Sequence, residues 1–450
     1  MSTGGTDLTR KLGFFPATNI VVANMIGAGI FTTSGLLIAG LHSPLLMMAL
    51  WLGGGIIAFC GALSYGELGA ALPEAGGEYL FLSRIFHPGF GFLSGWVSFI
   101  VGFSAPIAAS AIGFSSYFFQ AFPGAAGWLP EFLGRDPGVP NKLLSVFIIL
   151  IFTGLHSVGL KTGTRVQNVL TVVKVVLIVA LIGGGLASVQ GDFGHFTAPV
   201  TPGHDPAGIK TIGLSLMWIM FAYSGWNAST YIGSEIRDPA RNLPASLLAG
   251  TGLVILLYLL LNLVFVYAIP PADMEGVIPV GGLATERLFG LQAGHLFSLL
   301  IAFALFSSLS AFLIIGPRIY YSMAKDGLFF RAVARVHPRF GVPSIAIWLQ
   351  GGIAILFTLT GTFDQILTYM GFSLGIFPVI AIAGLFRLRM QGKIAVKMPG
   401  YPYVQVIYLS AGVLILILSL LERPLESGIA LITTLIGLPV YYLFRKTGKR

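Results

Sequence analysis

A glycine-containing segment interrupts the first long apolar stretch of this chain of 450 residues. It reads Asn24-Met25-Ile26-Gly27-Ala28-Gly29-Ile30-Phe31 and lies inside the stretch near residues 13–38. A bilayer core takes about 20 apolar residues in helical form, so that stretch is long enough to cross it. Glycine lowers helix propensity and leaves the backbone uncovered. We therefore predict a helix that breaks near mid-membrane and exposes backbone N–H and C=O groups to a cavity.

A second segment of this kind reads Phe221-Ala222-Tyr223-Ser224-Gly225-Trp226-Asn227, inside the apolar stretch 209–235. The chain holds about twelve apolar stretches, of which these interrupted ones are the first and the sixth, so each opens a set of five. Interrupted segments at matching places in two halves are typical of transporters built on inverted repeats. Close helix packing at small residues is the alternative interpretation for either glycine pattern.

The composition and the apolar stretches together predict an all-α membrane protein. Apolar types make up 55% of the residues and charged types only 10%, which excludes an ordinary soluble surface. A short interfacial helix is expected within 73–87. The predicted spans lie near residues 13–38, 44–70, 89–120, 141–159, 166–189, 209–235, 245–269, 291–317, 343–360, 363–386, 403–421 and 426–444.

Lysine and arginine are distributed unevenly between the two sides of these spans. With a cytoplasmic N-terminus, 20 of the 26 fall in cytoplasmic segments and five in outer loops, and Lys174 alone lies within the membrane. Such an excess marks the cytoplasmic side of membrane proteins. We expect a multi-pass protein of the cell (inner) membrane with both tails, 1–12 and 445–450, in the cytoplasm. The net charge of +9 is then a topology signal, and no nucleic-acid partner is expected.

The predicted breaks suit an amino acid zwitterion. Amides freed at the start of a half-helix attract a carboxylate, and freed carbonyls accept from an ammonium group. In this scheme the amides of 28–30 bind the carboxylate, and the carbonyls near 25, 26, 221 and 224 bind the ammonium. The candidate substrate-binding residues are Met25, Ile26, Gly27, Ala28, Gly29, Ile30, Phe221, Ala222, Ser224 and Asn227.

Other chemistries find no support in the motifs. Gly27-Ala28-Gly29 is no dinucleotide fingerprint, because Thr32 stands where a third glycine belongs and no strand precedes it. The seven histidines and the single cysteine, Cys60, show no metal-ligand spacing. No nucleophile–base pair is apparent at membrane depth, so an enzyme is not expected. We expect neither a cofactor nor a bound metal.

Several further motifs accompany the two breaks. They are Ser64-Tyr65-Gly66-Glu67-Leu68-Gly69 running into Pro73-Glu74-Ala75-Gly76-Gly77-Glu78-Tyr79, Arg165-Val166-Gln167-Asn168 before Lys174, Glu235 after the second break, and Pro317-Arg318-Ile319-Tyr320 followed by Asp326-Gly327-Leu328. In this order and spacing they resemble the amino acid–polyamine–organocation superfamily over nearly the whole chain. Within it, the sequence is most similar to the L-type light-chain amino acid transporters and their bacterial relatives.

The resemblance implies the leucine-transporter fold and alternating-access transport of amino acids. This fold has ten core helices in two inverted five-helix repeats, here 13–189 and 209–386, plus two peripheral helices, here 403–444. Phe221 would be the aromatic gate over the substrate, and Ala28 stands where the family often has serine. Animal members pair with a heavy subunit through a cysteine in an outer loop. The matching loop, about 121–140, has none, so no disulfide-linked heavy subunit is expected.

Lys174 is the one basic residue within a predicted span. A charged group at that depth costs several kcal/mol unless it is paired, so it usually marks a site or a pathway; a lysine that snorkels to the interface is the alternative. The resemblance places it where sodium-coupled relatives bind sodium. Its expected partners are the carbonyls around Ile26–Gly27 and the hydroxyls of Ser307, Ser308 or Ser310. A positive charge there repels a metal cation, which predicts sodium-independent transport.

The remaining charged residues near the membrane lie at the inner ends of spans. Glu67, Glu235 and Arg318 are expected to form ion pairs or an inner gate among themselves, separate from the aromatic gate Phe221 over the substrate. With Lys174 as the only charge at depth, the predicted substrate is a neutral L-amino acid, moved by alternating access in an exchanger. Proton-coupled symport and a membrane amino acid sensor remain the alternatives.

Overall fold

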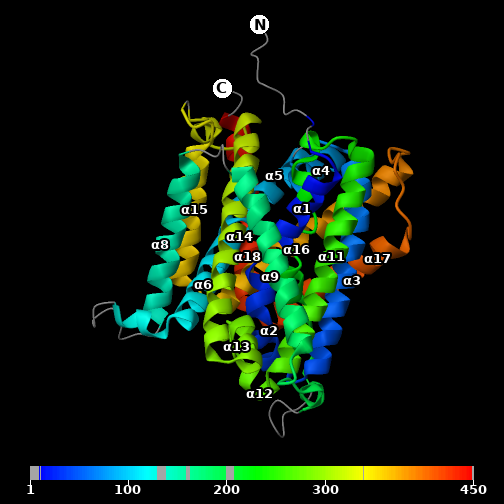
Figure 1. Ribbon diagram of the computed structural model, residues 1–450. Coiled ribbons are helices and arrows are strands. Elements are labelled where there is room, and N and C mark those ends of the chain that lie inside the picture. Colours follow the sequence, from blue (N-terminus) through cyan, green and yellow to red (C-terminus); the bar gives the residue numbers. More distant parts are fainter. Residues whose placement is uncertain are drawn as a thin grey trace.

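The computed structural model describes residues 10, 12–74, 76–128, 138–158, 163–198, 207–337 and 339–447, and these form a bundle of helices (Figure 1). Within these ranges, nine helical segments are long and apolar enough to cross a membrane. Three shorter apolar helices, Thr171–Ala187, Ile209–Ala222 and Ser344–Thr360, supply the other spans that the sequence predicts. The expectation of an all-α protein of about twelve spans is confirmed.

Every predicted span coincides with a helix or a pair of helices. The first half contains α1 (Phe14–Met25), α2 (Ala28–Leu41), α3 (Pro44–Ala71), α4 (Glu78–Ile85), α5 (Pro88–Val97), α6 (Ser104–Ala121), α8 (Gly138–Ser157) and α9 (Gly163–Ala187). The second half contains α10 (Ile209–Ala222), α11 (Pro239–Ala268), α12 (Pro271–Met274), α13 (Val280–Phe289), α14 (Leu291–Lys325), α15 (Ser344–Thr360), α16 (Phe363–Met390), α17 (Tyr403–Glu422) and α18 (Pro424–Thr447). The predicted interfacial helix is α4, whereas α12 and α13 were not predicted.

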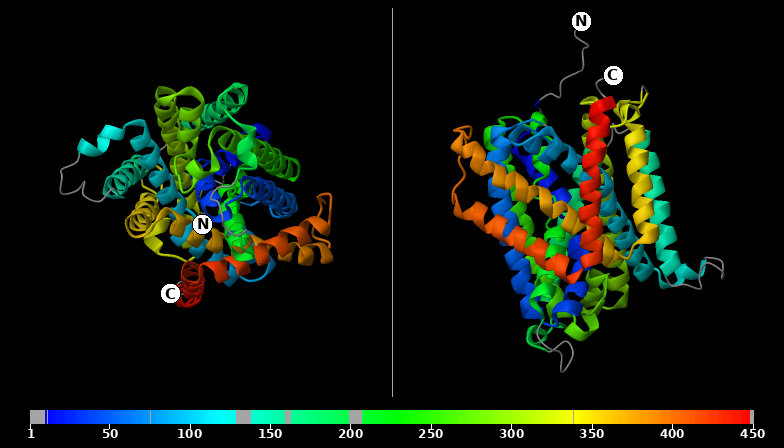
Figure 2. Two further views of the ribbon diagram at one scale, coloured as in Figure 1. Left: turned by 90° about the horizontal axis from the view of Figure 1, so that it is seen from below. Right: turned by 180° about the vertical axis from the view of Figure 1, so that it is seen from behind.

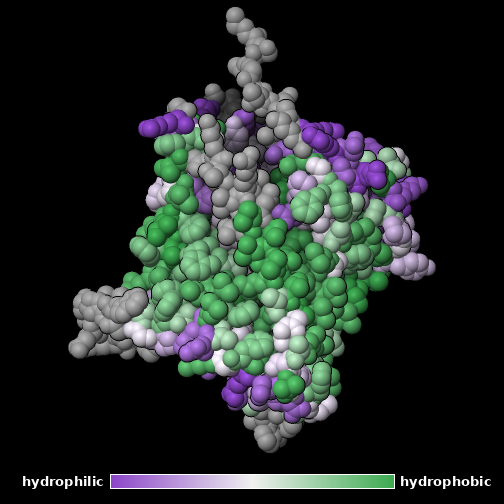
Figure 3. All heavy atoms as spheres, in the orientation of Figure 1, coloured by the Kyte–Doolittle hydropathy of each residue, from purple (hydrophilic) through white to green (hydrophobic). Residues whose placement is uncertain are grey.

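The outer surface of the bundle suits a bilayer. Large apolar side chains such as Leu155, Val176, Leu256 and Ile432 are exposed on it. Hydrophobic residues form a broad band across the visible face, with hydrophilic residues gathered at its upper and lower margins (Figure 3). Lipid rather than water covers such a band, because water would leave its apolar area exposed at a large free-energy cost. The chain is a multi-pass membrane protein.

Among the described spans, the first (α1 with α2) and the third (α5 with α6) are the most enclosed by the bundle. Beside them, α3 packs along α11, and α6 packs along α14. The helices α17 and α18 lie at its periphery (Figure 2). Helix α1 begins and α18 ends at the upper end in Figure 1, which also carries α4. We call this end the terminal face; α12 and α13 lie at the opposite face.

The first predicted break is present and is two residues long. Helix α1 ends at Met25 and α2 begins at Ala28. Between them, Ile26 has ψ 91° and Gly27 has φ −127° and ψ −154°, so both residues are extended. Neither helix can therefore continue the hydrogen-bond ladder of the other.

The second predicted break is longer. Helix α10 ends at Ala222, and the chain continues without regular helix to two 3₁₀ turns, Ala228–Tyr231 and Gly233–Glu235. Gly225 has φ +94°, a conformation that residues with a side chain rarely adopt. The sequence predicts this break but not that the rest of the span is 3₁₀ rather than α-helical. Its rise per residue is larger, so few residues cover the remaining depth.

The third span contains an irregularity that the sequence does not signal. Ser98–Gly102 forms a π-helical turn between α5 and α6. Such turns insert a residue into an α-helix and are frequent at functional sites. Ser98 and Gly102 both line the cavity described next.

Candidate functional site

The two broken helices meet backbone to backbone. A Cβ atom built on Gly29 would lie 2.6 Å from Cα of Ala222, and one built on Gly225 would lie 2.8 Å from the carbonyl carbon of Asn24. Only glycine fits at such distances, since real Cβ atoms do not approach other carbon atoms so closely. The two glycines therefore hold the breaks face to face. Gly27, by contrast, has space, because its nearest neighbour would be the Ser308 hydroxyl at 3.7 Å.

Lys174 provides hydrogen bonds to the backbone of the first break. Its side chain is 1% exposed, and its Nζ donates to the Ile26 carbonyl at 2.6 Å and to the Ser308 hydroxyl at 2.9 Å. The Ser308 hydroxyl in turn donates to the same carbonyl at 3.1 Å. One ammonium group thus joins α9, α14 and the break. Of the expected serines, Ser307 is buried on the same helix, and Ser310 bonds to His156 of α8 at 3.0 Å.

Tyr258 of α11 joins the two breaks to each other. Its hydroxyl donates to the Met25 carbonyl at 2.6 Å and lies 3.1 Å from the Ala222 carbonyl. Its ring packs edge-on against Trp51 of α3. Sequence reasoning missed this residue, because a tyrosine within a uniformly apolar span carries no local signal of its partner.

These contacts determine which backbone groups of the first break remain available to a ligand. The Ile26 oxygen already accepts two hydrogen bonds and the Met25 oxygen accepts one. The Phe221 carbonyl accepts from the Ser224 N–H at 2.8 Å. Protein donors therefore occupy carbonyls that the sequence analysis assigns to a substrate ammonium. The amides of Ala28, Gly29 and Ile30 stand in the first turn of α2, where a helix provides no acceptor, and so suit a carboxylate.

A cavity of about 120 Å³ lies between the breaks and the terminal face. Of the predicted residues, Phe221, Ser224 and Asn227 line it, and Phe221 is 8% exposed. Met25 to Ile30 and Ala222 lie outside its wall. Residues that the sequence analysis did not select also line the cavity: Asn24, Glu78, Ser98, Phe103, Met220, Trp226, Tyr231, Phe312 and Tyr408. Trp226 packs edge-on against Tyr65 and Tyr408.

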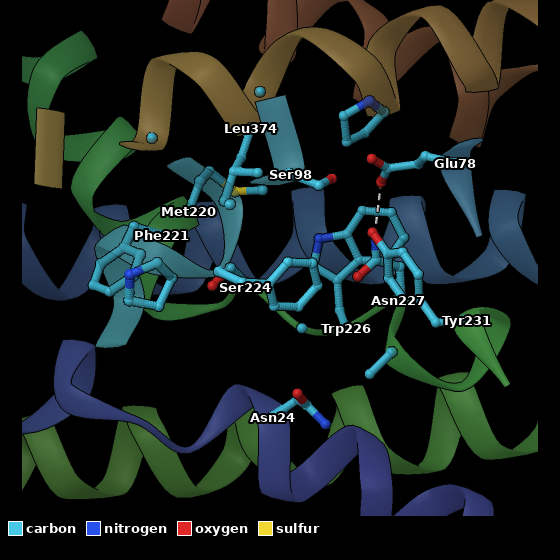
Figure 4. Close-up of a pocket in the computed structure, with 18 of the residues that line it drawn as sticks. Asn24, Glu78, Ser98, Met220, Phe221, Ser224, Trp226, Asn227, Tyr231 and Leu374 are labelled. Atoms are coloured by element: carbon cyan, nitrogen blue, oxygen red, sulfur yellow. Dashed lines mark hydrogen bonds between the residues drawn. The ribbon is translucent and has the colours of Figure 1, made fainter. Parts of the chain in front are cut away.

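The cavity has an apolar end and a polar end. In Figure 4, Phe221 and Met220 lie at one end, Glu78 and Asn227 lie at the other, and Ser224 and Trp226 lie between them. Glu78 is 5% exposed. It accepts from the Asn227 side-chain amide at 2.8 Å and from the Tyr65 hydroxyl at 3.0 Å. Burial raises the pKa of Glu78 to about 7, although both hydrogen bonds act to lower it.

Glu78 is the main site residue that sequence reasoning missed. It belongs to the quoted motif 73–79, and it begins α4, a helix outside the membrane-spanning segments. A glutamate is common in the first turn of a helix, because its negative charge is stabilised by the positive end of the helix dipole. In an interfacial helix such a side chain is expected to face water. Only the packing of α4 onto the bundle turns it inward. The only indication in the sequence was that Glu78 belongs to the motif 73–79.

The expected ion pairs at the inner end differ from those observed. Glu67 bonds to Arg389, at the end of α16, with its Oε2 2.9 Å from Nε and its Oε1 contacting a terminal nitrogen. Glu67 also accepts from the Met398 N–H at 2.7 Å. Arg318 is exposed, and the Glu235 backbone carbonyl accepts from the Leu12 N–H at 2.9 Å. Within the described residues, Glu67 therefore forms a structural ion pair with Arg389, which is remote in sequence, rather than with Arg318. A gating role of Glu67, Glu235 and Arg318 stays a prediction.

The part of the chain that the structure describes contains no group of three or more His, Cys, Asp or Glu that could hold a metal ion. Cys60 is a buried free thiol of α3. The loop expected to lack a heavy-subunit cysteine lies partly outside the described residues, since 129–137 are among the gaps.

Comparison with known proteins provides independent evidence about the family of this chain. A model of a family described as amino acid permease matches residues 12–441. The chain is 28% identical to the serine/threonine exchanger SteT of Bacillus subtilis (strain 168), over 99% of each chain. It is 28% identical to the mouse (Mus musculus) large neutral amino acids transporter small subunit 2, over 98% of this chain and 82% of the relative. It is 27% identical to the mouse b(0,+)-type amino acid transporter 1, over 98% and 88%.

Proposed function

The chain belongs to the amino acid permease family of the amino acid–polyamine–organocation superfamily, and on this premise we propose that it exchanges neutral L-amino acids across the membrane without sodium. Amino acid transport itself follows from the family. The neutral substrate, the sodium independence and the exchange mode are the proposal. Relatives described as a serine/threonine exchanger and a large neutral amino acids transporter support it.

The observation that carries the proposal is the contact of Lys174 with the Ile26 carbonyl. A carbonyl freed by a helix break is a ligand for a hard cation. Here an ammonium group takes that place at 2.6 Å, and its positive charge repels a second cation nearby. The lysine thus substitutes for a coupling ion and fixes the break without one.

Neutral substrates fit the cavity near the breaks. Phe221, Met220, Phe103 and Leu374 supply an apolar wall there, and Ser224 is its small polar member. The amides at the start of α2, which lie beyond the wall of this cavity, take the carboxylate of a substrate that has reached the breaks, and Phe221 closes over the side chain. A cationic or anionic side chain would lie among apolar groups at a cost of several kcal/mol.

The remaining assignments belong to the same proposal. The terminal face is cytoplasmic, in a cell (inner) membrane, as the excess of Lys and Arg on that side favours. Residues 13–189 and 209–386 are the two inverted repeats, and 403–444 are the peripheral helices. The transporter works without a disulfide-linked subunit, which the burial of its one cysteine supports.

Counterflow in proteoliposomes tests this function. Vesicles loaded with unlabelled L-serine or L-leucine should take up the labelled amino acid faster than empty vesicles, equally in sodium and in choline. Competition by all twenty amino acids then defines the substrate class. Strong sodium dependence would contradict the role of Lys174. Better competition by arginine or glutamate than by every neutral amino acid would contradict the neutral substrate.

A further inference from the structure

Glu78 is a carboxylate in the wall of the transport cavity with one oxygen already bonded and one still available. Both protein donors, the Tyr65 hydroxyl and the Asn227 amide, bond to Oε1. Within the described residues, Oε2 receives no hydrogen bond and no ion pair includes Glu78. A buried carboxylate without a cation is costly, so this oxygen is suited to a charged donor that enters the cavity.

The titratable and charged groups around Glu78 do not occupy its Oε2, which leaves this oxygen available to a ligand. The phenols of Tyr65 (α3), Tyr231 and Tyr408 (α17) face it. The basic groups nearby have other partners or face outward: Arg84 of α4 bonds to Glu74, Arg389 of α16 bonds to Glu67, and Arg387 is exposed. The His87 ring, before α5, accepts from the Gly89 N–H, and Tyr79 of α4 donates to Asp326.

The path of the substrate has opposite polarity at its two ends. At the breaks stand the Lys174 ammonium and the first turn of α2, which both favour negative charge. There the carbonyls of Met25 and Ile26 already accept from protein donors. At the other end, Glu78 is the only carboxylate among the described residues of the wall. A zwitterion therefore lowers its energy with its carboxylate toward the breaks and its ammonium toward Glu78.

We propose that Glu78, positioned by Asn227 and Tyr65, is a second subsite that binds the substrate ammonium while the amino acid passes between the breaks and the terminal face. This inference rests on the proposed function and deepens it. The subsite recognises a primary ammonium group and is indifferent to the side chain. It acts on one side of the transporter only, since Glu78 lies at the end of the cavity nearest the terminal face.

The protonation of Glu78 gives this subsite a pH dependence of known sign. An ammonium group binds the ionised carboxylate, and burial raises the pKa of Glu78 to about 7. Acidification through that value protonates Glu78 and weakens the subsite. Between pH 8 and pH 6 the ionised fraction of such a group falls about tenfold, so the KM measured from the terminal face should rise about tenfold.

The experiment uses the full chain in proteoliposomes with one orientation and measures the KM for L-serine and L-leucine from each face. Glu78→Gln keeps the size of the side chain and removes the charge. We expect about a tenfold higher KM from the terminal face, less than twofold change from the other face, and no remaining rise at low pH. Glu78→Asp should restore part of the affinity and the pH dependence. Glu74→Gln, in the same motif but in an exposed ion pair with Arg84, should match the wild type.

A second measurement separates the subsite from the rest of the binding site. Ethanolamine and 3-methylbutylamine carry the ammonium group without the carboxylate, whereas 3-hydroxypropionate and 4-methylpentanoate carry the carboxylate alone. Calorimetry on purified protein should show that Glu78→Gln weakens binding of the two amines about tenfold and leaves the two acids unchanged.

The outcomes distinguish this inference from the proposed function. Equal KM values for Glu78→Gln and wild type on both faces, or an equal loss on both faces, would overturn the subsite. A pH gradient that drives net accumulation in wild type but not in Glu78→Gln would also overturn it, because Glu78 would then carry a proton. Absence of any exchange in the wild type would refute the proposed function, and amine binding by calorimetry would still decide for or against Glu78.

Discussion

The two breaks face each other, yet they are built for different tasks. The first is two residues long, and protein groups saturate it: Lys174 and Ser308 take the Ile26 carbonyl and Tyr258 takes the Met25 carbonyl. The second runs from Tyr223 to Asn227, and most of its residues line the cavity. One break is thus an anchor and the other is a wall of the binding site. Both breaks contain glycine. A glycine therefore predicts a helix break, but it does not predict whether the break anchors a helix or lines the binding site.

The difference has a physical cause. A gap of two extended residues frees few carbonyls, and one ammonium with one hydroxyl can satisfy them. The longer gap, from Tyr223 to Asn227, frees more backbone groups than the shorter one. Its groups bond locally, as in the Ser224 N–H to Phe221 carbonyl contact, and its side chains turn toward the cavity. The contacts of Lys174 and Ser308 tie the first break to α9 and α14, whereas side chains of the second break line the cavity.

The largest expected effect comes from removing the anchor. Lys174→Ala leaves the Ile26 carbonyl and the Ser308 hydroxyl without their charged donor, and each lost bond of this kind costs about 1.5–3 kcal/mol. We expect counterflow to fall by about a hundredfold or more, which is what roughly 3 kcal/mol represents. Lys142→Ala is the matched control, because Lys142 also donates to a backbone carbonyl, that of Leu359, but at the exposed surface. Full activity in Lys174→Ala would show that the first break is no anchor.

The next effect tests the contact between the breaks. Gly29→Ala places a Cβ 2.6 Å from Cα of Ala222 and forces the two backbones apart; overpacking of this kind costs about 1–3 kcal/mol. We expect a lower Tm in detergent and about a tenfold loss of counterflow, the equivalent of roughly 1.4 kcal/mol. Gly27→Ala, with no atom closer than 3.7 Å, is the control and should keep the Tm. Equal Tm values for both variants would contradict the close contact.

The smallest effect should come from the wall. Phe221→Ala opens the lid over the substrate, and closing motions often limit turnover, so exchange should slow by about three- to fivefold with the fold intact. Phe114→Ala provides the comparison, since Phe114 is a buried phenylalanine of α6 stacked on Phe306 at 4.4 Å. Each variant removes a mostly buried phenyl ring, so lost packing alone should affect both to a similar extent. If both slowed exchange equally, Phe221 would have only a packing role.

The sequence by itself determined the features that depend on short windows of residues. Hydropathy along the chain located the spans, and glycine with small polar residues located both breaks. The residue pattern of 73–87, the segment between the second and third spans, predicted the interfacial helix α4. A lone lysine within apolar residues required a partner, but it was the family resemblance that named the broken span and the serines of α14; in the structure Lys174 donates to the Ile26 carbonyl and the Ser308 hydroxyl.

Only the tertiary structure decided which remote groups complete the site. Asn227 meets Glu78 across 149 positions, Arg389 meets Glu67 across 322, and Tyr258 meets Met25 across 233. No local pattern encodes such pairs, because each residue alone looks like an ordinary member of its helix. Their choice depends on how α4 and α11 pack onto the broken spans and how α16 packs onto α3. Burial then turns Glu78 from a surface carboxylate into a cavity group.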